Sequence, residues 1–507
     1  MRIVFRADAS TQMGSGHIMR CMCLADALQK HQAQIWFIVR HITDYLEQIL
    51  LDKGFKVILL PDKNSQTDDL FHSEWLGVSQ IDDALATCKV LQHLEKPMDW
   101  LIVDHYAIDH RWERIVKPLV DKVLVIDDLA DRIHDCDILL DQNQYLDLSS
   151  RYKNKVHENT QLLLGARYAL LRNEFRVAHQ QKKQEFNPQV KKILIFFGGM
   201  DKENYTSKLL NSLEHDQLSQ QLKFVVVIGA QHPDLNHIKK LCEQFDYELH
   251  INSTKMAELM LQADIAIGAG GSSSWERCCV GLPSLAFAIA RNQIQLTEDA
   301  ALQGLIDSPN IDWNNPESIR QIMMSFIHNP LARQRIFHTA FNAVDGKGTQ
   351  RVLRALGVRS LSLRRATFED SQSLWQWRNH DSIRLVSRNT DLIALENHEQ
   401  WFKSILESSD RVMLIAEHDH LPVGVIRFDF EETCAEISIY CVPNEQGAGF
   451  SIDMLQEAEN FLFQHYCNIT EIKAVVLADN WASHHLFLNA GYQRNSTTYL
   501  KKLVRYS

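Results

Sequence analysis

The sequence predicts an α/β protein in which two successive domains with parallel sheets are followed by a smaller α+β domain. Up to about residue 357, short β-branched runs alternate with longer amphipathic stretches, as in parallel sheets covered by helices. The polar stretch 176–192, which contains Pro188, divides these runs into two sets. From residue 361, apolar runs follow one another with only short polar breaks, which favours antiparallel strands. We therefore expect domains at residues 1–176, 190–357 and 361–507.

The apolar runs place the expected strands. In the first domain they are Ile3–Phe5, Ile35–Val39, Val57–Leu60, Trp100–Val103, Val123–Ile126 and Ile138–Leu140. In the second domain they are Ile193–Phe197, Phe224–Ile228, Leu249–Ile251, Ile265–Ile267 and Ser284–Ala286. In the third they are Met413–Glu417, Val423–Phe430 and Ala435–Val442, with a turn at Asp419-His420 and a helix at Ile452–Phe463.

Composition excludes several classes of protein. The chain of 507 residues carries 53 basic and 64 acidic side chains, and this net charge of -11 makes nucleic acid a poor partner. Its ten cysteines have neither zinc spacing nor the density of a disulfide framework, which favours a reducing cytoplasm. No window approaches the ~18 apolar residues of a membrane span, so we expect a cytoplasmic protein that binds no membrane. The sequence makes no prediction of oligomeric state.

A glycine loop follows the first expected strand. Gly14 and Gly16 flank Ser15, and His17 opens the helical run that comes next. This order of strand, loop and helix directs backbone N–H groups at an anion, although a tight turn without a ligand gives the same pattern. Because an imidazole accepts a proton near neutral pH, His17 is a candidate for catalysis.

Polar residues follow two further strands of the first domain. Asp104 and Tyr106 come after one strand, and Asp127-Asp128 come after the next. Open parallel sheets gather their ligand groups at these strand ends. Taken singly, each residue is equally well explained as a hydrogen-bonded structural group.

Glycines also follow strands in the second domain. Gly199 ends one such loop, and Gly271 and Ser272 belong to another that leads into a helix carrying Glu276. Small residues and hydroxyl donors at a helix start suit a diphosphate. Glu276 is placed to accept hydrogen bonds from a ribose, or else it simply supplies favourable charge in the first helical turn.

Two such domains, each with a glycine loop, resemble the GT-B architecture of nucleotide-sugar glycosyltransferases, in which Rossmann-like domains face each other across a cleft. Read together, several segments resemble a more specific family, the UDP-2,4-diacetamido-2,4,6-trideoxy-β-L-altropyranose hydrolases of pseudaminic acid biosynthesis (PseG). These segments are Gly14–Cys21, Ile102–Tyr106, Ile126–Arg132, Leu139–Asn143, Gly165–Arg172, Phe196–Gly199 and Ala269–Cys279. The resemblance covers about residues 1–350.

This resemblance implies that water attacks the anomeric carbon with inversion and releases UDP. His17 matches the catalytic histidine of the family and would activate or orient the water. Because UDP is already a good leaving group, the acid carboxylate that glycosidases usually need would be dispensable. The remaining substrate-binding candidates are Gly14, Gly16, Arg20, Asp104, Tyr106, Gly199, Gly271, Ser272, Glu276 and Asn292, of which Asn292 would approach the sugar. No metal is expected.

A third glycine loop follows the last of the three strands in the third domain. Gln446, Gly447, Gly449 and Ser451 lie between that strand and a helix, where backbone amides can cradle a pyrophosphate. The loop resembles the CoA-binding motif of the GNAT acetyltransferases, although Ser451 replaces its final small residue. Downstream, Asn480, Ser483 and the Gly491-Tyr492 turn match the closing segment of that family. The resemblance implies acetyl-CoA as a co-substrate.

The resemblance to the GNAT acetyltransferases also directs attention to an acid and a base for acetyl transfer. Many members of the family use a tyrosine as general acid where this chain has Phe487. Glu436, on the central strand, is a candidate base that would take a proton from a sugar ammonium. A surface carboxylate on a strand is an equally good explanation of Glu436.

The two resemblances imply successive steps, N4-acetylation of a UDP-4-amino sugar and removal of UDP from its product. UDP-amino sugar and acetyl-CoA are therefore the expected small-molecule partners. Two alternatives stay open: a GT-B glycosyltransferase fused to an acetyltransferase, or a non-catalytic nucleotide-sugar-binding module that serves the acetyltransferase.

Overall fold

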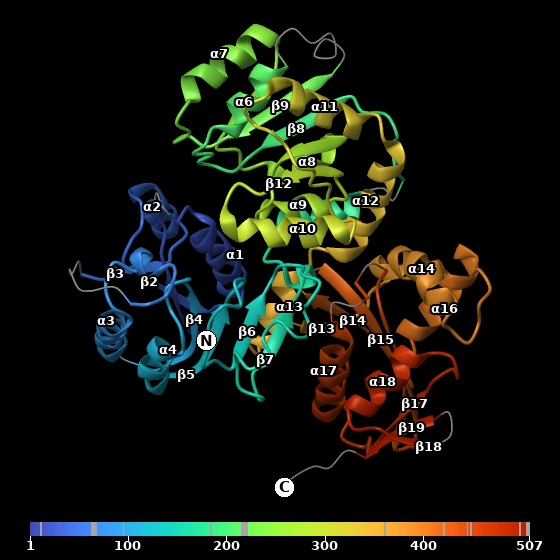
Figure 1. Ribbon diagram of the computed structural model, residues 1–507. Helices are drawn as coiled ribbons and strands as arrows, with labels where there is room; N and C mark the ends of the chain where they lie inside the picture. Colours follow the sequence, from blue (N-terminus) through green and yellow to red (C-terminus); the bar gives the residue numbers. More distant parts are fainter. Residues whose placement is uncertain are drawn as a thin grey trace. The chain divides into compact units, whose positions relative to one another are not determined.

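The computed structural model describes residues 1–10, 13–61, 68–94, 96–182, 185–213, 222–358, 361–418, 421–443, 445–446, 449–495 and 498–502. The chain forms two compact units, Met1–Leu356 and Gly357–Ser507 (Figure 1). We call them unit 1 and unit 2.

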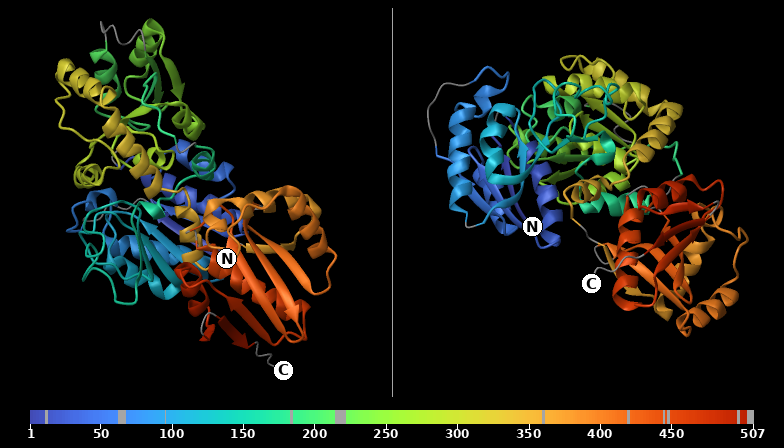
Figure 2. Two further views of the ribbon diagram at one scale, coloured as in Figure 1. Left: turned by 90° about the vertical axis from the view of Figure 1, so that its right-hand side faces the viewer. Right: turned by 90° about the horizontal axis from the view of Figure 1, so that it is seen from below.

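Unit 1 begins with a seven-stranded parallel sheet, which defines its first subdomain. The strands run in the order β3-β2-β1-β4-β5-β6-β7, with helices packed on both faces (Figure 2). The strands are β1 (Arg2–Ala7), β2 (Gln34–Val39), β3 (Lys56–Leu59), β4 (Met98–Asp104), β5 (Val120–Ile126), β6 (Ile138–Asp141) and β7 (Gln161–Leu164). The helices are α1 (Gly16–Lys30), α2 (Asp44–Asp52), α3 (Gln80–His93), α4 (His110–Val116) and α5 (Asn173–Gln181). The sequence predicts six of these strands and misses β7.

A second parallel sheet, of five strands in the order β10-β9-β8-β11-β12, defines the second subdomain of unit 1. The strands are β8 (Lys192–Phe196), β9 (Lys223–Ile228), β10 (Glu248–Ile251), β11 (Ile265–Ala269) and β12 (Ser284–Phe287). The helices are α6 (Tyr205–Ser212), α7 (Leu235–Phe245), α8 (Met256–Gln262), α9 (Ser273–Cys279), α10 (Ile294–Leu302), α11 (Pro316–Ile327), α12 (Pro330–Ala343) and α13 (Gly348–Ala355).

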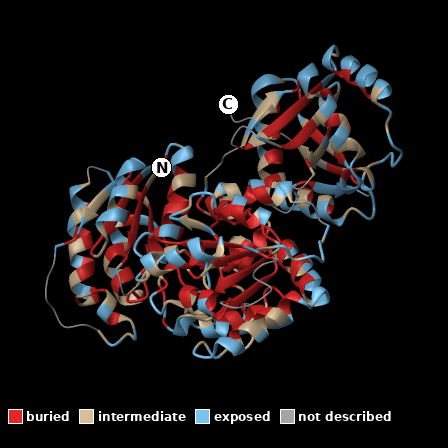
Figure 3. Cartoon of the chain, turned by 90° about the horizontal axis from the view of Figure 1, so that it is seen from above, coloured by how far each residue is buried: buried red, intermediate tan, exposed pale blue. Residues whose placement is uncertain are grey.

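The two subdomains share buried contacts. One apolar core contains Tyr145 and Phe175 as well as Leu194 and Trp275, so it runs across the boundary between the sheets. Figure 3 shows that buried residues are concentrated in the strands of the sheets. The last helix, α13, returns to the first subdomain, where the indole Nε1 of Trp100 donates to the carbonyl oxygen of Leu356 at 3.0 Å.

Gly348 explains how closely α13 approaches the first subdomain. A Cβ atom built on this glycine would lie 2.2 Å from the carbonyl oxygen of Ala169. Only a residue without a side chain fits such a backbone contact. The C-terminal end of unit 1 is therefore packed against its first subdomain.

Unit 2 is built on a mixed sheet in the order β13-β14-β15-β16-β17-β19-β18. The strands are β13 (Leu361–Arg365), β14 (Arg411–His418), β15 (Leu421–Glu431), β16 (Cys434–Cys441), β17 (Glu471–Val475), β18 (Gln493–Asn495) and β19 (Thr498–Lys502). The helices are α14 (Ser371–Asn379), α15 (Asp381–Arg384), α16 (Leu395–Leu406), α17 (Phe450–His465) and α18 (Trp481–Asn489). Helix α17 packs into the larger of the two apolar cores.

These sheets confirm the predicted fold class, two Rossmann-like subdomains in a GT-B-like unit followed by an α+β domain. Strands β14, β15 and β16 pair antiparallel as expected, while the predicted turn at Asp419-His420 lies outside the described residues. Among the described residues, no helix combines the length and the apolar character that crossing a membrane would require.

Candidate active sites

The topology of the first sheet places one candidate site. Strands β1 and β4 are neighbours, although β2 and β3 come between them in the chain, so the strand order reverses there. Parallel sheets bind ligands beside the carboxyl ends of strands at such a reversal. His17 lies in the first turn of α1, after β1, and Asp104 is the last residue of β4. The two predicted residues thus meet at the reversal.

His17, Asp104 and Arg20 form a buried cluster. The Nδ1 atom of His17 lies 2.6 Å from Oδ1 of Asp104, and Arg20 donates from Nε and Nη2 to the two oxygens of the same carboxylate at 2.6 and 2.7 Å. Burial by itself raises the pKa of Asp104, but Arg20 and His17 outweigh burial and hold that pKa well below its usual range. Asp104 is therefore a carboxylate that accepts from the Nδ1–H of His17, and the other ring nitrogen, Nε2, takes no part in this bond.

Asp128 and Tyr106 extend this cluster. Arg20 donates from Nη1 to Oδ2 of Asp128 at 3.1 Å, and the ring of Tyr106 meets the ring of His17 edge-on, with centroids 4.6 Å apart. Burial and the neighbouring carboxylate of Asp128 raise the pKa of Tyr106 well above its usual value, so its hydroxyl stays protonated. The cluster therefore presents an aromatic face and a hydroxyl beside the histidine.

Two aromatic residues that the sequence analysis did not select complete this face. His72 and Trp75 lie at the short helix η1 (Ser73–Trp75), and their rings pack 5.3 and 5.7 Å from the ring of Tyr106. Burial is the largest influence on His72 and lowers its pKa, which favours the neutral ring. Flat, neutral rings beside a polar cluster suit the apolar face of a sugar.

The first glycine loop reaches the site from β1. Gly14 has φ of +78°, a left-handed conformation that glycine adopts without strain, and its N–H donates to the carbonyl oxygen of Ser10 at 2.8 Å. Gly16 is the first residue of α1. The tight turn at Gly14 thus brings the start of α1, and with it His17, to the end of the sheet.

The second sheet reverses its strand order in the same way, between the neighbouring strands β8 and β11. Gly199 follows β8, and Gly271 and Ser272 follow β11. A Cβ on Gly229 would lie 2.1 Å from the carbonyl oxygen of Gly199, so this loop packs against the end of β9. Gly271 lies against Gln293 instead, because its Cβ would be 3.2 Å from Nε2 of that residue.

Glu276 lies in α9, just after the Gly271 loop. Its Oε1 is 3.4 Å from Nη2 of Arg172, and burial, only partly opposed by Arg172, raises the pKa of Glu276. The oxygens of a carboxyl group accept hydrogen bonds from ligand hydroxyls in either protonation state. This behaviour is compatible with the predicted contact to a ribose.

Asn292 connects the second subdomain with the histidine cluster. It belongs to η5 (Arg291–Gln293), and its Nδ2 lies 3.5 Å from the hydroxyl oxygen of Tyr106. The structure therefore brings His17, Arg20, Asp104, Tyr106 and Asn292 together. Gly271, Ser272 and Glu276 form a second group on the β11–α9 connection.

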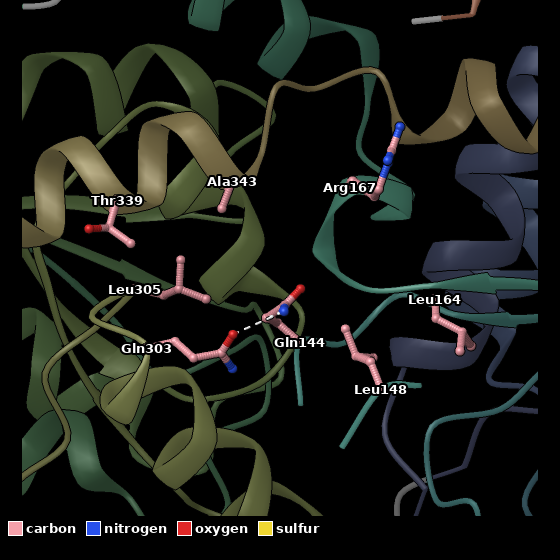
Figure 4. Close-up of a pocket in the computed structure, with 8 residues that line it drawn as sticks. All are labelled: Gln144, Leu148, Leu164, Arg167, Gln303, Leu305, Thr339 and Ala343. Atoms are coloured by element: carbon pink, nitrogen blue, oxygen red, sulfur yellow. Dashed lines mark hydrogen bonds between the residues drawn. The ribbon is translucent and has the colours of Figure 1, made fainter. Parts of the chain in front are cut away.

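A cavity of about 390 Å³ lies elsewhere along the boundary of the two subdomains (Figure 4). It is lined by Gln144, Leu148, Leu164, Arg167, Gln303, Leu305, Thr339 and Ala343. Because half of these residues are apolar and none carries a proton-transfer group at neutral pH, the cavity is not the site of the predicted chemistry.

The candidate site of unit 2 lies where two parallel strands separate. The pairing of β16 with β17 ends at Ile437 and Ala474, although β16 continues to Cys441. Since parallel strands end at the same edge of a sheet, the segments that follow both strands lie at that edge. These segments carry Gln446–Ser451 and Asn480–Ser483, the two predicted CoA-binding stretches.

The glycine loop after β16 begins α17. Gly449 caps this helix with φ of +88°, and the Oγ atom of Ser451 lies 3.2 Å from the Sγ atom of Cys441. Gln446 is exposed, and its Nε2 donates to Oγ of Ser382 at 3.2 Å. Gly447 lies outside the described residues.

The segment after β17 begins α18. Oδ1 of Asn480 accepts from the N–H of Ser483 at 3.1 Å, so the side chain caps the helix and leaves its Nδ2 as a donor. Phe487, at the position of the expected tyrosine, is buried and stacks on Tyr499. The ring of Phe487 therefore serves the core.

Glu436 lies on β16 between two cations. Its oxygens are 2.6 Å from Nη2 of Arg388 and 3.3 Å from Nζ of Lys473. Burial works in the opposite direction, but both cations lower the pKa of Glu436 below its usual value. A carboxylate held in this way is a weaker base than a free one, and its predicted catalytic role stays a prediction.

Within the part of the chain that the structure describes, no group of three or more His, Cys, Asp or Glu side chains is arranged to hold a metal ion. The expectation that no metal takes part stays a prediction.

Unit 2 combines a mixed sheet with a glycine loop at the start of α17. Residues 360–493 match the family model of the acetyltransferase (GNAT) domain, which confirms the resemblance of the sequence to this family.

Three curated relatives match between 58% and 83% of the chain. An uncharacterized protein of Methanocaldococcus jannaschii, MJ1062, is 25% identical over 83% of this chain and 81% of its own length. The spore coat polysaccharide biosynthesis protein SpsG of Bacillus subtilis is 24% identical over 69% of this chain and 96% of its own. The UDP-2,4-diacetamido-2,4,6-trideoxy-β-L-altropyranose hydrolase of Campylobacter jejuni is 25% identical over 58% of this chain and 93% of its own. These matches confirm that the N-terminal part of the chain resembles such hydrolases.

Two solved structures illustrate the similarity of each unit. Spermidine N-acetyltransferase from Vibrio cholerae, in complex with CoA and spermine, aligns with 29% of this chain and 94% of its own at 17% identity and a TM-score of 0.26. MurG of Acinetobacter baumannii aligns with 70% of this chain and 99% of its own at 13% identity and a TM-score of 0.48.

Proposed function

We propose that the protein carries out two successive reactions on one nucleotide sugar. Unit 2 transfers the acetyl group of acetyl-CoA to the 4-amino group of a UDP-amino sugar, and unit 1 hydrolyses the product, UDP-2,4-diacetamido-2,4,6-trideoxy-β-L-altropyranose, to free sugar and UDP. The observation that carries the proposal is the His17–Asp104 pair at the reversal point of a nucleotide-type sheet, in a chain that also holds a GNAT domain. The 25% identity of unit 1 to a hydrolase of that name supports the substrate.

In the hydrolysis, Nε2 of His17 takes a proton from water as the water oxygen attacks the anomeric carbon on the face opposite UDP. The bond from that carbon to the phosphate oxygen breaks, its electron pair leaves with UDP, and the configuration inverts. Asp104 stabilises the imidazolium through Nδ1–H until His17 returns the proton to solvent. Asn292 and Tyr106 contact the sugar, while Gly271, Ser272 and Glu276 hold the UDP.

In the acetyl transfer, the free amine of the sugar attacks the thioester carbonyl carbon, the carbon–sulfur bond breaks, and CoA leaves as the thiol after gaining a proton. Backbone N–H groups of the Gln446–Ser451 segment bind the pyrophosphate of acetyl-CoA, and Nδ2 of Asn480 donates to its arm. Glu436 is the candidate group that receives the proton of the sugar ammonium.

The test is to incubate the full chain with the UDP-4-amino sugar and acetyl-CoA and to follow the products by mass spectrometry. We expect the acetylated nucleotide sugar first, then UDP and the free diacetamido sugar, with no acceptor alcohol added. Release of UDP only when an acceptor alcohol is present would identify a glycosyltransferase instead, and a chain that yields neither product would refute the proposal.

Two variants separate the reactions and serve as controls for each other. H17A should abolish UDP release and leave acetylation intact, whereas Q446A should slow acetylation and leave hydrolysis of the diacetylated substrate intact. If H17A retains full hydrolysis, unit 1 does not act through this histidine. If the wild type acetylates the sugar but releases no UDP, and H17A changes neither UDP binding nor this reaction, unit 1 is only a binding module.

A further inference from the structure

Two consecutive amide side chains link the subdomains of unit 1. Asn143 and Gln144 follow β6, and each bonds to the second subdomain. Oδ1 of Asn143 accepts from the indole Nε1 of Trp275 in α9 at 2.8 Å. Nε2 of Gln144 donates to Oε1 of Gln303 at 3.0 Å, the bond drawn across the cavity in Figure 4. The two links are alike in chemistry and adjacent in the chain.

The two links differ in where they lead inside the first subdomain. Nδ2 of Asn143 donates to Oδ2 of Asp128 at 3.1 Å, and the same oxygen accepts from Nη1 of Arg20 at 3.1 Å. From Arg20 the bonds continue through Asp104 to His17. An unbroken path of hydrogen bonds therefore joins Trp275 to the histidine, and only its middle, at Asp128, is partly exposed.

The bonds of Gln144 do not lead to the histidine cluster. Its Oε1 accepts from the backbone N–H of Ala166 at 3.2 Å, and its other partner is Gln303. Both side chains line the cavity rather than the histidine cluster. Gln144 is thus a natural control for Asn143.

The chemistry of the path leaves little choice of residue at position 143. An indole N–H only donates and a carboxylate only accepts, so the group between Trp275 and Asp128 must accept on one side and donate on the other. An asparagine amide does both, and its two partners fix which atom is oxygen and which is nitrogen. An aspartate would set two carboxylates against each other, and a leucine would leave Trp275 and Asp128 without these partners.

We propose that Asn143 is a positioning residue that ties the orientation of His17 to the placement of α9, the helix that follows the nucleotide loop. Asp128, Arg20 and Asp104 connect Asn143 to His17. The imidazole of His17 is therefore aligned for catalysis only when Trp275 of the second subdomain is bonded to Asn143 of the first. Hydrolysis is then coupled to occupancy of the nucleotide site. This inference rests on the hydrolysis proposed above.

The test compares N143L with Q144L in the full chain, using the diacetylated UDP-sugar as substrate. N143L should lower kcat about 10- to 100-fold and change KM little, because misaligned catalytic groups cost rate more than binding. Q144L should retain kcat within about twofold. W275F, which removes only the indole donor, should lower kcat in the same direction, and adding it to N143L should bring little further loss, since both break one path. Equal losses in N143L and Q144L, or additive losses in the double variant, would overturn the inference.

A second readout does not depend on turnover. In histidine-labelled protein, with the His17 NMR signal assigned by its loss in H17Q, addition of UDP should shift that signal in the wild type and in Q144L but not in N143L. A shift that persists in N143L contradicts the coupling. A wild type that shows the Asn143-dependent shift but releases no UDP from the sugar contradicts the proposed hydrolysis and leaves the coupling standing. Urea unfolding of each variant shows whether N143L is folded, and W275F replaces it if it is not.

Discussion

Asp104 bonds to His17 through one oxygen and to Arg20 through both, at 2.6 to 2.7 Å. The guanidinium of Arg20 balances the charge of the Asp104 carboxylate, while Oδ1 of that carboxylate still bonds to the His17 ring. Asp104 therefore remains ionised and orients the ring. A buried aspartate without Arg20 would meet the full cost of burial. The predictions for unit 1 follow from this arrangement.

Replacing Asp104 by asparagine should lower kcat for UDP release by about 10²- to 10⁴-fold, since the amide neither fixes the tautomer nor stabilises the imidazolium. KM should change little, and steady-state release of UDP measures both. D83N is the matched control, because Asp83 is also a buried carboxylate paired with an arginine, Arg6, at 2.8 Å but is not part of the histidine cluster. Comparable losses of kcat in D83N and D104N would show that Asp104 is only structural.

The lowered pKa of Asp104 also predicts an acid-sensitive fold. In the unfolded chain this carboxyl takes up its proton near pH 4, whereas in the folded chain it does so only at lower pH. Its contribution to stability is therefore complete above about pH 5 and is lost as the pH falls below about 4. Urea unfolding between pH 3 and 6 should show a shallower loss for D104N than for the wild type. Parallel curves would contradict the assignment.

The aromatic face beside His17 should recognise the sugar rather than the nucleotide. W75A should raise KM for the diacetylated UDP-sugar by about tenfold, the effect of losing one stacked ring, whereas W75F should keep most of the affinity. Binding of UDP alone, measured by calorimetry, should be the same in all three proteins. A matching fall in UDP affinity would place Trp75 at the nucleotide instead.

The left-handed conformation of Gly449 should be required for binding acetyl-CoA, whereas the left-handed conformation of Gly491 should not. G449A strains the start of α17 by about 1 kcal/mol and should raise KM for acetyl-CoA. Gly491 has φ of +83° and room for a Cβ, so G491A imposes similar strain away from the glycine loop. Acetyl transfer kinetics and thermal unfolding compare the two variants. An equal rise in KM for both would mean that general strain is the cause.

Glu436 is tested by its neighbour across the sheet. Asp429 lies opposite it on β15 and is also paired with a cation, Arg427, at 2.8 Å. If Glu436 is the base, E436Q should lower kcat for acetyl transfer by about 100-fold near neutral pH and less at high pH, where the amine is already free, while D429N should not. A similar small loss in both variants would assign Glu436 to the surface of the strand.

Local patterns predicted the parts of these sites that are local in the chain. A glycine loop after an apolar run is recognisable in the sequence. The turn at Gly14, the position of His17 and the loop before α17 could therefore be predicted. The strand that ends at Asp104 is visible for the same reason. Strand β7 was missed because its four residues, one glutamine and three leucines, include no β-branched or aromatic side chain, the types that favour a strand.

The contacts between distant segments have no such pattern. His72 and Trp75 join the site only because η1 folds against Tyr106, and a single tryptophan in a connection carries no signal of that packing. Asn143 and Trp275 are 132 residues apart, so their bond is a product of the tertiary fold. Each segment could be recognised in the sequence, but the contacts between the segments could not be predicted from it.

The return of α13 to the first subdomain determines where the acetyltransferase is attached. Leu356, the residue before unit 2, is bonded to Trp100 of the half that carries His17. The chain therefore enters unit 2 directly from the subdomain that holds the histidine cluster, and not from the subdomain that holds the Gly271 loop.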